Sequence, residues 1–170
     1  MKQLTAVYPG SFDPPTNGHL DIIIRTTHLF PKVIVAVTDN SNKNPTFSLE
    51  DRIKMLKAAT KGIKNIEIDS FSCLLVNYID MKKASIIIRG LRAVSDFEYE
   101  FQMALMNRRL NRKAETVFLM PDEAYTYLSS RLVKEVARLG GPIKGLVPEL
   151  ARKYLESYSE KCDKKTRRNR

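Results

Sequence analysis

A short segment between two apolar runs, YPGSFDPPTNGH at residues 8–19, combines residues that free or fix the backbone with one histidine. Where a strand leads through such a loop into a helix, the N–H groups at the helix N-terminus can bind an anion. Gly10 lets the backbone turn and approach a ligand closely, and Gly18 does the same at the helix entrance. His19 can donate a hydrogen bond beside the positive end of the helix dipole. The loop is therefore a candidate phosphate site.

Two common phosphate-binding loops do not fit this segment. The spacing of Gly10 and Gly18 differs from G-x-G-x-x-G, and no Lys-Ser or Lys-Thr follows a G-x-x-x-x-G pattern. The alternative is that the PG, DPP and NG sequences only form turns and that His19 is an ordinary helix-start residue. Taken alone, the segment leaves both interpretations open.

Five apolar, β-rich runs predict the strands that position this loop. They lie at residues 4–8, 33–37, 66–68, 85–88 and 116–120, and most are continuous rather than alternating. Continuous runs are typical of parallel strands that are covered on both faces. Because helical segments separate the runs, the pattern predicts an open α/β fold with a five-stranded, doubly wound parallel sheet. In such Rossmann-like sheets, ligands bind beyond the carboxyl ends of the strands.

Capping residues, prolines and glycines set the predicted limits of the helices. The helices are expected at residues 19–29, from Ser48 to about Lys61, from Ser95 to about Asn111, from Ser129 to about Leu139, and from Pro148 onward. In the third helix, the buried face is expected to consist of Phe97, Phe101, Ala104 and Leu105.

Composition limits the domain organisation and the partners. The 170 residues fit a single domain over residues 1–160, followed by a basic segment at residues 161–170 that we expect to be disordered. The net charge of +10 favours anionic partners, either nucleic acid or phosphorylated small molecules. Cys73 and Cys162 lie far apart, and no apolar stretch approaches the ~20 residues of a membrane span. We expect a cytoplasmic protein with reduced thiols and no membrane association.

Four segments together resemble one family. TNGH at residues 16–19 resembles the T/H-x-G-H motif of a nucleotidyltransferase superfamily that also contains the class I aminoacyl-tRNA synthetases. The preceding YPGSFDP narrows the resemblance to the bacterial phosphopantetheine adenylyltransferases. Three further segments agree in order and spacing, at residues 42–52, 87–108 and 117–137, so the resemblance covers about residues 3–155. RGLRAVSDFEYE, at residues 89–100, is a strong pattern by itself, whereas TNGH is weak.

The resemblance implies transfer of the adenylyl group of ATP to 4'-phosphopantetheine, which gives dephospho-coenzyme A and pyrophosphate. It also implies Mg²⁺ carried by the nucleotide phosphates without a protein metal site, coenzyme A as a feedback ligand, and a homohexamer that uses the apolar face near residues 97–110. No nucleic acid partner is expected. The attacking phosphate oxygen is already anionic near neutral pH, so catalysis should come from positioning and from donors aimed at the charge of the reacting phosphates.

The resemblance also assigns roles to single residues. The catalytic residues would be His19, Ser11, Lys43 and Arg92, with His19 stabilising the pentavalent transition state. The ATP-binding residues would be Ser11, Phe12, His19, Gly90, Leu91, Arg92, Glu100, Tyr125, Thr126, Tyr127, Leu128, Ser129, Ser130 and Arg131. The residues that bind phosphopantetheine would be Ser11, Lys43, Leu75 and Arg89. The chain departs from the family pattern at Arg131, where a small hydroxyl residue is expected, and at Cys73, where glycine or an acid is expected.

Several of these residues also fit a structural role. Lys43 fits a solvated loop residue, Glu100 fits a carboxylate on a helix surface, and Ser129 fits an ordinary helix cap. Arg92 fits an ion-pair partner of Asp96 or Glu98. Arg89 directly follows the run SIII, at a strand end where sheets of this class place ligands.

Other functions are weighed against the same residues. A cytidylyltransferase or a nicotinamide-mononucleotide adenylyltransferase would share the fold and His19 but differ in the acceptor pocket. A synthetase fragment is disfavoured because KMLK, at residues 54–57, lies within a capped amphipathic helix. A nucleic-acid-binding module is suggested by the basic charge and tail, but it lacks an aromatic RNA platform, zinc spacing or a recognisable helix-turn-helix.

Overall fold

Five parallel strands form the sheet in the computed structural model, which describes residues 4–39, 44–92 and 94–168. The strands are β1 (Thr5–Gly10), β2 (Lys32–Thr38), β3 (Ile66–Phe71), β4 (Ile86–Gly90) and β5 (Glu115–Leu119), in the spatial order β3-β2-β1-β4-β5. Every strand overlaps one predicted apolar run, so the predicted fold class is confirmed. The strand order reverses between β1 and β4, so the carboxyl ends of these two strands form the switch point. In open α/β sheets this is the place where ligands usually bind.

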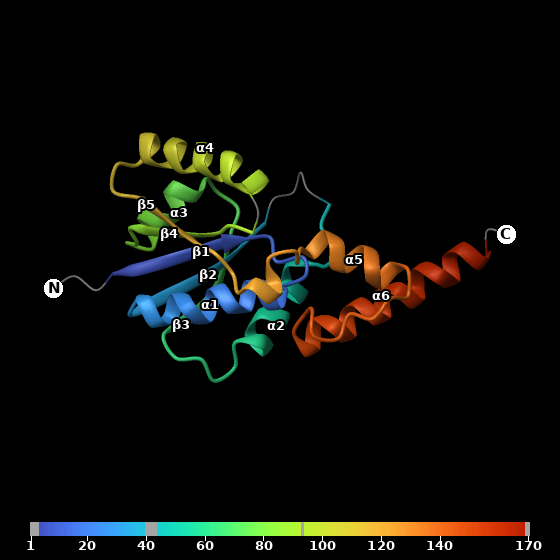
Figure 1. Cartoon of the computed structure of the whole chain (residues 1–170). Helices are drawn as coiled ribbons and strands as arrows, with labels where there is room; N and C mark the ends of the chain where they lie inside the picture. The colour runs from blue at the N-terminus through green and yellow to red at the C-terminus, as the bar shows by residue number, and fades with distance from the viewer. Residues whose placement is uncertain (1–3, 40–43, 93, 169–170) are drawn as a thin grey trace.

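Helices cover both faces of the sheet (Figure 1). One face is covered by α1 (Asn17–Leu29) and α2 (Leu49–Ala59), and the other by α3 (Leu75–Met81) and α4 (Val94–Leu110). Alternate residues of β1 point to the two sides: Tyr8 belongs to the core that contains Ile23 of α1, and Val7 to the core that contains Ile79 of α3. Burial on both faces is the physical reason for the continuous apolar runs.

Serine caps begin α2 and α5 (Ser130–Arg138), as predicted. Ser48 Oγ accepts a hydrogen bond from the Asp51 N–H at 3.1 Å, and Ser129 Oγ accepts one from the Leu132 N–H at 3.0 Å. The predicted helices do not include α3 or the short 3₁₀ helix η1 (Glu123–Tyr125). The α3 helix has seven residues and no side-chain cap, so both usual signals are missing from the sequence.

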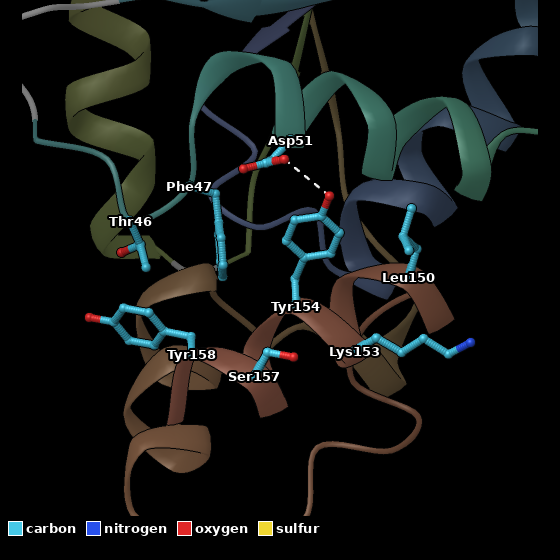
Figure 2. A pocket seen from close by; sticks show the side chains of 8 residues that line it. All are labelled: Thr46, Phe47, Asp51, Leu150, Lys153, Tyr154, Ser157 and Tyr158. Carbon is cyan, nitrogen blue, oxygen red and sulfur yellow. Dashed lines mark hydrogen bonds between the residues drawn. The ribbon is translucent and has the colours of Figure 1, made fainter. Parts of the chain in front are cut away.

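Helix α6 (Glu149–Arg168) packs against α2 and α5 beyond the end of the sheet (Figure 1). Tyr154 of α6 donates a hydrogen bond from its hydroxyl to Asp51 Oδ1 at 3.0 Å (Figure 2). The ring of Phe47 meets the Tyr154 ring edge-on, with 6.0 Å between centroids. These contacts anchor the segment that precedes α2.

The structure differs from the sequence prediction at residues 161–168 of the basic segment, the part that it describes. Helix α6 continues to Arg168, whereas the sequence predicts a disordered extension there. Extending an existing helix costs little compared with starting one, and Lys and Arg are good helix formers. The sequence predicts disorder here because the segment has no apolar periodicity. A helix that has already begun can continue through such a segment, so this signal does not mark its end. The predicted domain extent of residues 1–160 stays a prediction.

The predicted buried face of α4 is wrong for the single chain. The side chains of Phe97, Phe101 and Leu105 are 44%, 46% and 50% exposed. Tyr99 and Met106 are exposed as well, so apolar residues lie on several sides of the helix. A helix with this distribution is typical of one buried in a larger core. No helix within the described residues has the length and apolarity needed to cross a membrane.

A buried carboxylate ties the loop after β1 to α5. Asp13 accepts hydrogen bonds from the N–H groups of Thr46 and Phe47 at 3.0 and 2.9 Å, and from Lys134 Nζ at 2.7 Å. Burial alone would raise the pKa of Asp13, but these hydrogen bonds outweigh burial and hold the pKa below its ordinary value. Asp13 therefore joins three segments as a charged carboxylate.

We predict that Asp13→Asn lowers the free energy of unfolding by about 1.5–3 kcal/mol at neutral pH, because the amide removes the charge that pairs with Lys134. The pKa of Asp13 is lower in the folded chain than in the unfolded chain. Its contribution is therefore present above the ordinary carboxyl pKa of about 4 and is lost as the pH falls further.

Urea unfolding of both proteins, repeated from neutral to acidic pH, measures this difference. The matched control is Glu50→Gln, which removes only an exposed ion pair with Lys54 and should leave stability almost unchanged. Equal stability of wild type and Asp13→Asn at neutral pH would contradict the role of Asp13.

Candidate active site

A cavity of about 370 Å³ lies at the carboxyl ends of β1 and β4. The predicted site residues that line it are Ser11, Phe12, His19, Arg89, Gly90, Arg92, Glu100, Ser129, Ser130 and Arg131. They come from the loop after β1, the start of α1, the end of β4 and the residues after it, α4, and the start of α5, most of which are distant in the sequence. Three arginines and three serines give this cavity the charge and the donors that suit an anion.

A capping box orients the imidazole of His19. Thr16 Oγ1 accepts a hydrogen bond from the His19 N–H at 3.3 Å, and the Thr16 N–H donates one to His19 Nδ1 at 3.0 Å. Because Nδ1 accepts this bond, the neutral imidazole carries its proton on Nε2. The ring of Phe12 meets the imidazole edge-on, with 5.2 Å between centroids. His19 therefore offers one side-chain donor, Nε2–H, at the cavity wall.

Two ionisable groups of the cavity stay uncharged at neutral pH. Burial, and then the charge of Arg92, lower the pKa of His19 from 6.5 to about 4. Burial raises the pKa of Tyr8, which lines the same cavity, so its phenol keeps its proton. The cavity thus combines neutral donors with permanently charged arginines.

Arg89 and Glu100 form a two-pronged ion pair at the end of β4. Arg89 Nε donates to Glu100 Oε2 at 2.6 Å, and Arg89 Nη2 donates to Glu100 Oε1 at 2.5 Å. Arg89 Nη1 also donates to the carbonyl oxygen of Pro9 at 3.2 Å. This geometry fixes the plane of the guanidinium. The Glu100 side chain is 14% exposed, so it is not a carboxylate on an open helix surface.

The start of α5 is held against the loop after β1. Ser130 Oγ donates to the Pro14 carbonyl oxygen at 2.7 Å, and Arg92 Nη1 donates to the Leu128 carbonyl oxygen at 3.0 Å. The Ser129 hydroxyl caps α5, which confirms the alternative role of an ordinary helix cap. Ser129 also lines the cavity. The helix N-terminus therefore lies at the cavity with Arg131 beside it.

Comparisons with known proteins identify the family. The family described as cytidylyltransferase-like matches residues 7–136. A phosphopantetheine adenylyltransferase of Desulfatibacillum aliphaticivorans is 58% identical over 152 residues, which cover 89% of this chain and 87% of that protein. One from Dictyoglomus turgidum is 57% identical over 159 residues, which cover 93% of this chain and 99% of that protein. The chain belongs to the phosphopantetheine adenylyltransferases.

A solved structure extends the comparison to the fold. The nicotinic acid mononucleotide adenylyltransferase of Plasmodium falciparum, complexed with NaAD, matches with a TM-score of 0.66 over 92% of this chain and 96% of that chain. At 15% sequence identity this match concerns the fold alone. The resemblance to the phosphopantetheine adenylyltransferases and the nucleotidyltransferase fold predicted from it are both confirmed.

Some residues predicted from this family do not line the cavity. These are Leu75, Leu91, Tyr125, Thr126, Tyr127 and Leu128. The Leu128 side chain lies in the core with α5 and α6, whereas Tyr127 is 62% exposed. Leu75 packs against the core that contains Ile79. Lys43 lies outside the described residues, and the binding roles of all these residues stay predictions.

Sequence reasoning missed other residues of the site. Tyr8 and Pro9 line the cavity beside Gly10, and their place at the end of β1, directly before Ser11, was an available signal. Arg52 of α2 does not line the cavity but binds the Ser11 carbonyl oxygen, and its place three residues before Met55, on the buried helical face, was a signal that the sequence prediction did not use.

We predict that His19 titrates with a pKa near 4 instead of its ordinary 6.5, because burial and Arg92 disfavour the imidazolium. The chain has two histidines, so a His28→Gln variant leaves one imidazole signal in a proton NMR titration. The chemical shift of that signal should stay constant until the pH falls well below 6. A midpoint near 6.5 in the folded protein would contradict the neutral-donor geometry.

Proposed function

We propose that this chain transfers the adenylyl group of ATP to 4'-phosphopantetheine, forming dephospho-coenzyme A and pyrophosphate in coenzyme A biosynthesis. The observation that carries the proposal is the single cavity shared by His19, Arg89, Arg92 and the start of α5. Such a cavity suits two phosphorylated reactants. The family to which the chain belongs supports the choice of ATP and phosphopantetheine.

The reaction joins two anions. A phosphate oxygen of phosphopantetheine attacks the α-phosphorus of ATP and forms a new P–O bond. The bond between the α-phosphorus and the oxygen that bridges to the β-phosphorus breaks, and its electron pair leaves with pyrophosphate. The attacking oxygen carries no proton that a base must remove. The contribution of the protein is therefore positioning and stabilisation of charge.

The donors of the cavity divide this task. His19 Nε2–H, uncharged and fixed by Thr16, donates to a non-bridging oxygen of the α-phosphate as charge develops there. Arg89, oriented by Glu100, binds the phosphate of phosphopantetheine. Arg92 and the N-terminus of α5 bind the β- and γ-phosphates, which suits a helix start that carries Ser129 and Ser130. Lys43, Ser11 and Leu75 complete the proposed contacts.

Mg²⁺ is proposed to arrive with ATP. In the cavity wall that the structure describes, Glu100 is the one carboxylate, and both of its oxygens bind Arg89. Among the described residues, no three His, Cys, Asp or Glu side chains gather to hold a metal ion. The side chains of this cavity wall therefore fit a metal ion that is held mainly by phosphate oxygens of ATP. Such an ion would neutralise charge on the leaving pyrophosphate.

A homohexamer, located in the cytoplasm, is proposed as the working form. The exposed Phe97, Phe101 and Leu105 of α4 are apolar surface that a second copy would cover. Coenzyme A is proposed as a feedback ligand of the same cavity, because it contains the pantetheine arm and an adenylyl group like those of the product.

The proposed activity is tested by mass-spectrometric detection of dephospho-coenzyme A formed from ATP, Mg²⁺ and phosphopantetheine. We predict that His19→Ala lowers turnover by about 10²–10³-fold, the usual effect of losing one donor to a transition-state oxygen. Circular dichroism should show that the variant stays folded. The control is His28→Ala, which removes the other imidazole and should keep full activity.

Two results would contradict the proposal. Wild-type protein that releases pyrophosphate without forming dephospho-coenzyme A would refute the acceptor. Turnover in His19→Ala close to that of wild type would refute the role of the imidazole.

A second prediction concerns the ion pair of the cavity. Glu100→Gln should lower kcat/KM for phosphopantetheine roughly tenfold to hundredfold, because Arg89 loses one of the two hydrogen bonds that fix its plane and the opposite charge that strengthens the other. The KM for ATP should change little. Steady-state kinetics with each substrate varied in turn separates the two effects, and the exposed Glu98→Gln on the same helix is the control. A change confined to the KM for ATP would instead make Glu100 a nucleotide contact.

A further inference from the structure

Arg52 is an arginine placed in the core of the protein. Its side chain belongs to α2 and is only 2% exposed. A buried guanidinium is costly unless its N–H groups find acceptors. Nε donates to the Phe47 carbonyl oxygen at 3.2 Å, and Nη1 donates to the carbonyl oxygens of Ser11 and Thr38 at 2.9 and 3.0 Å. Three backbone acceptors therefore meet one side chain.

These acceptors belong to three separate segments, one of which reaches the cavity. Thr38 ends β2, Ser11 lies in the loop after β1 and lines the cavity, and Phe47 precedes α2. The Phe47 N–H is bound by Asp13, and its ring lies against Tyr154 of α6 (Figure 2). Phe47 is thus a fixed point, and Arg52 connects it to the loop that carries Ser11.

The peptide unit that Arg52 holds is under strain. The Ser11 carbonyl belongs to the peptide bond with Phe12, and Phe12 has φ = 47°, in the left-handed region that a bulky residue rarely adopts. Such a conformation costs roughly 1–3 kcal/mol and persists only where the surroundings hold it. A side chain at Gly10 would come within 2.8 Å of the Phe12 ring, so the close approach of this ring requires glycine there.

The strained residue contacts the donor of the proposed reaction. The Phe12 ring is 1% exposed and packs edge-on against both His19 and Tyr8, with centroid distances of 5.2 and 5.4 Å. A chain of contacts therefore leads from the Arg52 guanidinium through the Ser11 carbonyl and the Phe12 ring to the imidazole. We propose that Arg52 is a positioning residue that holds the Ser11–Phe12 peptide in its strained form and thereby places Ser11 and His19 at the cavity.

The shape of the guanidinium explains why an arginine fills this place. Nε and Nη1 point in different directions within one plane, so one side chain reaches carbonyl groups from separate segments. The ammonium of a lysine keeps the charge but offers a single donor centre. Arg52→Lys should therefore lose some of the hydrogen bonds to the three backbone carbonyl oxygens but keep the positive charge.

The test measures two properties of the full-length Arg52→Lys protein at a temperature where circular dichroism shows it folded. Its kcat for dephospho-coenzyme A formation should fall about 10²-fold, as for a displacement of reacting groups by about 1 Å, while the KM for ATP changes little. The pKa of His19, measured by NMR in the His28→Gln background, should move from near 4 toward its ordinary 6.5, because the Phe12 ring covers the imidazole less completely.

The matched control is Ile34→Ala, which removes a fully buried side chain of β2 from the core that contains Val7 and Ile79. It should lose stability but keep the wild-type kcat and His19 titration. A folded Arg52→Lys protein with wild-type kcat and an unchanged His19 titration would overturn the proposal. Equal losses of kcat in Arg52→Lys and Ile34→Ala would overturn it too.

A second variant decides the matter if Arg52→Lys does not fold. Arg52→Ala leaves a space that guanidinium ion, added at millimolar concentration, can occupy. Recovery of kcat on addition would support the proposal, and recovery of the fold without kcat would overturn it. Of the two measurements, only kcat depends on the proposed adenylyl transfer. Absence of product with wild-type protein would refute that function, while the His19 titration would still test Arg52.

Discussion

The hydrogen bond from the Thr16 N–H to His19 Nδ1 determines what the cavity can do. It fixes the ring orientation and leaves the proton on Nε2, so that the imidazole is a donor toward the cavity. An imidazolium would have to break this bond, because a protonated Nδ1 cannot accept. Burial and the nearby charge of Arg92 oppose that protonation as well. One local contact at the start of α1 therefore selects both the tautomer and the charge state of the residue on which the proposed reaction depends.

Buried and partly buried charges hold the surrounding loops in place. Asp13 binds the segment before α2 and Lys134 of α5, and Arg52 binds the loop after β1 together with the end of β2. The Arg89–Glu100 pair does the same at the end of β4. Each charge is satisfied by backbone groups or by an opposite charge, so burying it does not leave an unpaired ion. The parallel sheet brings the strand ends together, and these polar contacts fix the loops that follow them.

The sequence predicts the sheet well because a strand buried on both faces leaves a continuous apolar run, as at residues 33–37 of β2. It predicts the starts of α2 and α5 because Ser48 and Ser129 cap them through short-range contacts. Contacts between distant residues could not be predicted in this way. In the sequence, Glu100 is compatible with a surface position, and only the fold shows that Arg89 lies beside it. The apolar residues of α4 give the same sequence pattern whether they are buried within their own chain or against another copy. Helix α3 is too short and too weakly capped to leave a signal.

The central claim is that the neutral imidazole of His19 donates from Nε2 to the phosphate at which the adenylyl group is transferred. A crystal structure of the protein with a non-hydrolysable ATP analogue and Mg²⁺ tests it most directly. We expect His19 Nε2 within hydrogen-bond distance of an α-phosphate oxygen, with the Thr16 N–H still bound to Nδ1. A triphosphate bound away from the cavity of Arg89 and Arg92, or an imidazole turned so that Nδ1 faces the nucleotide, would contradict it.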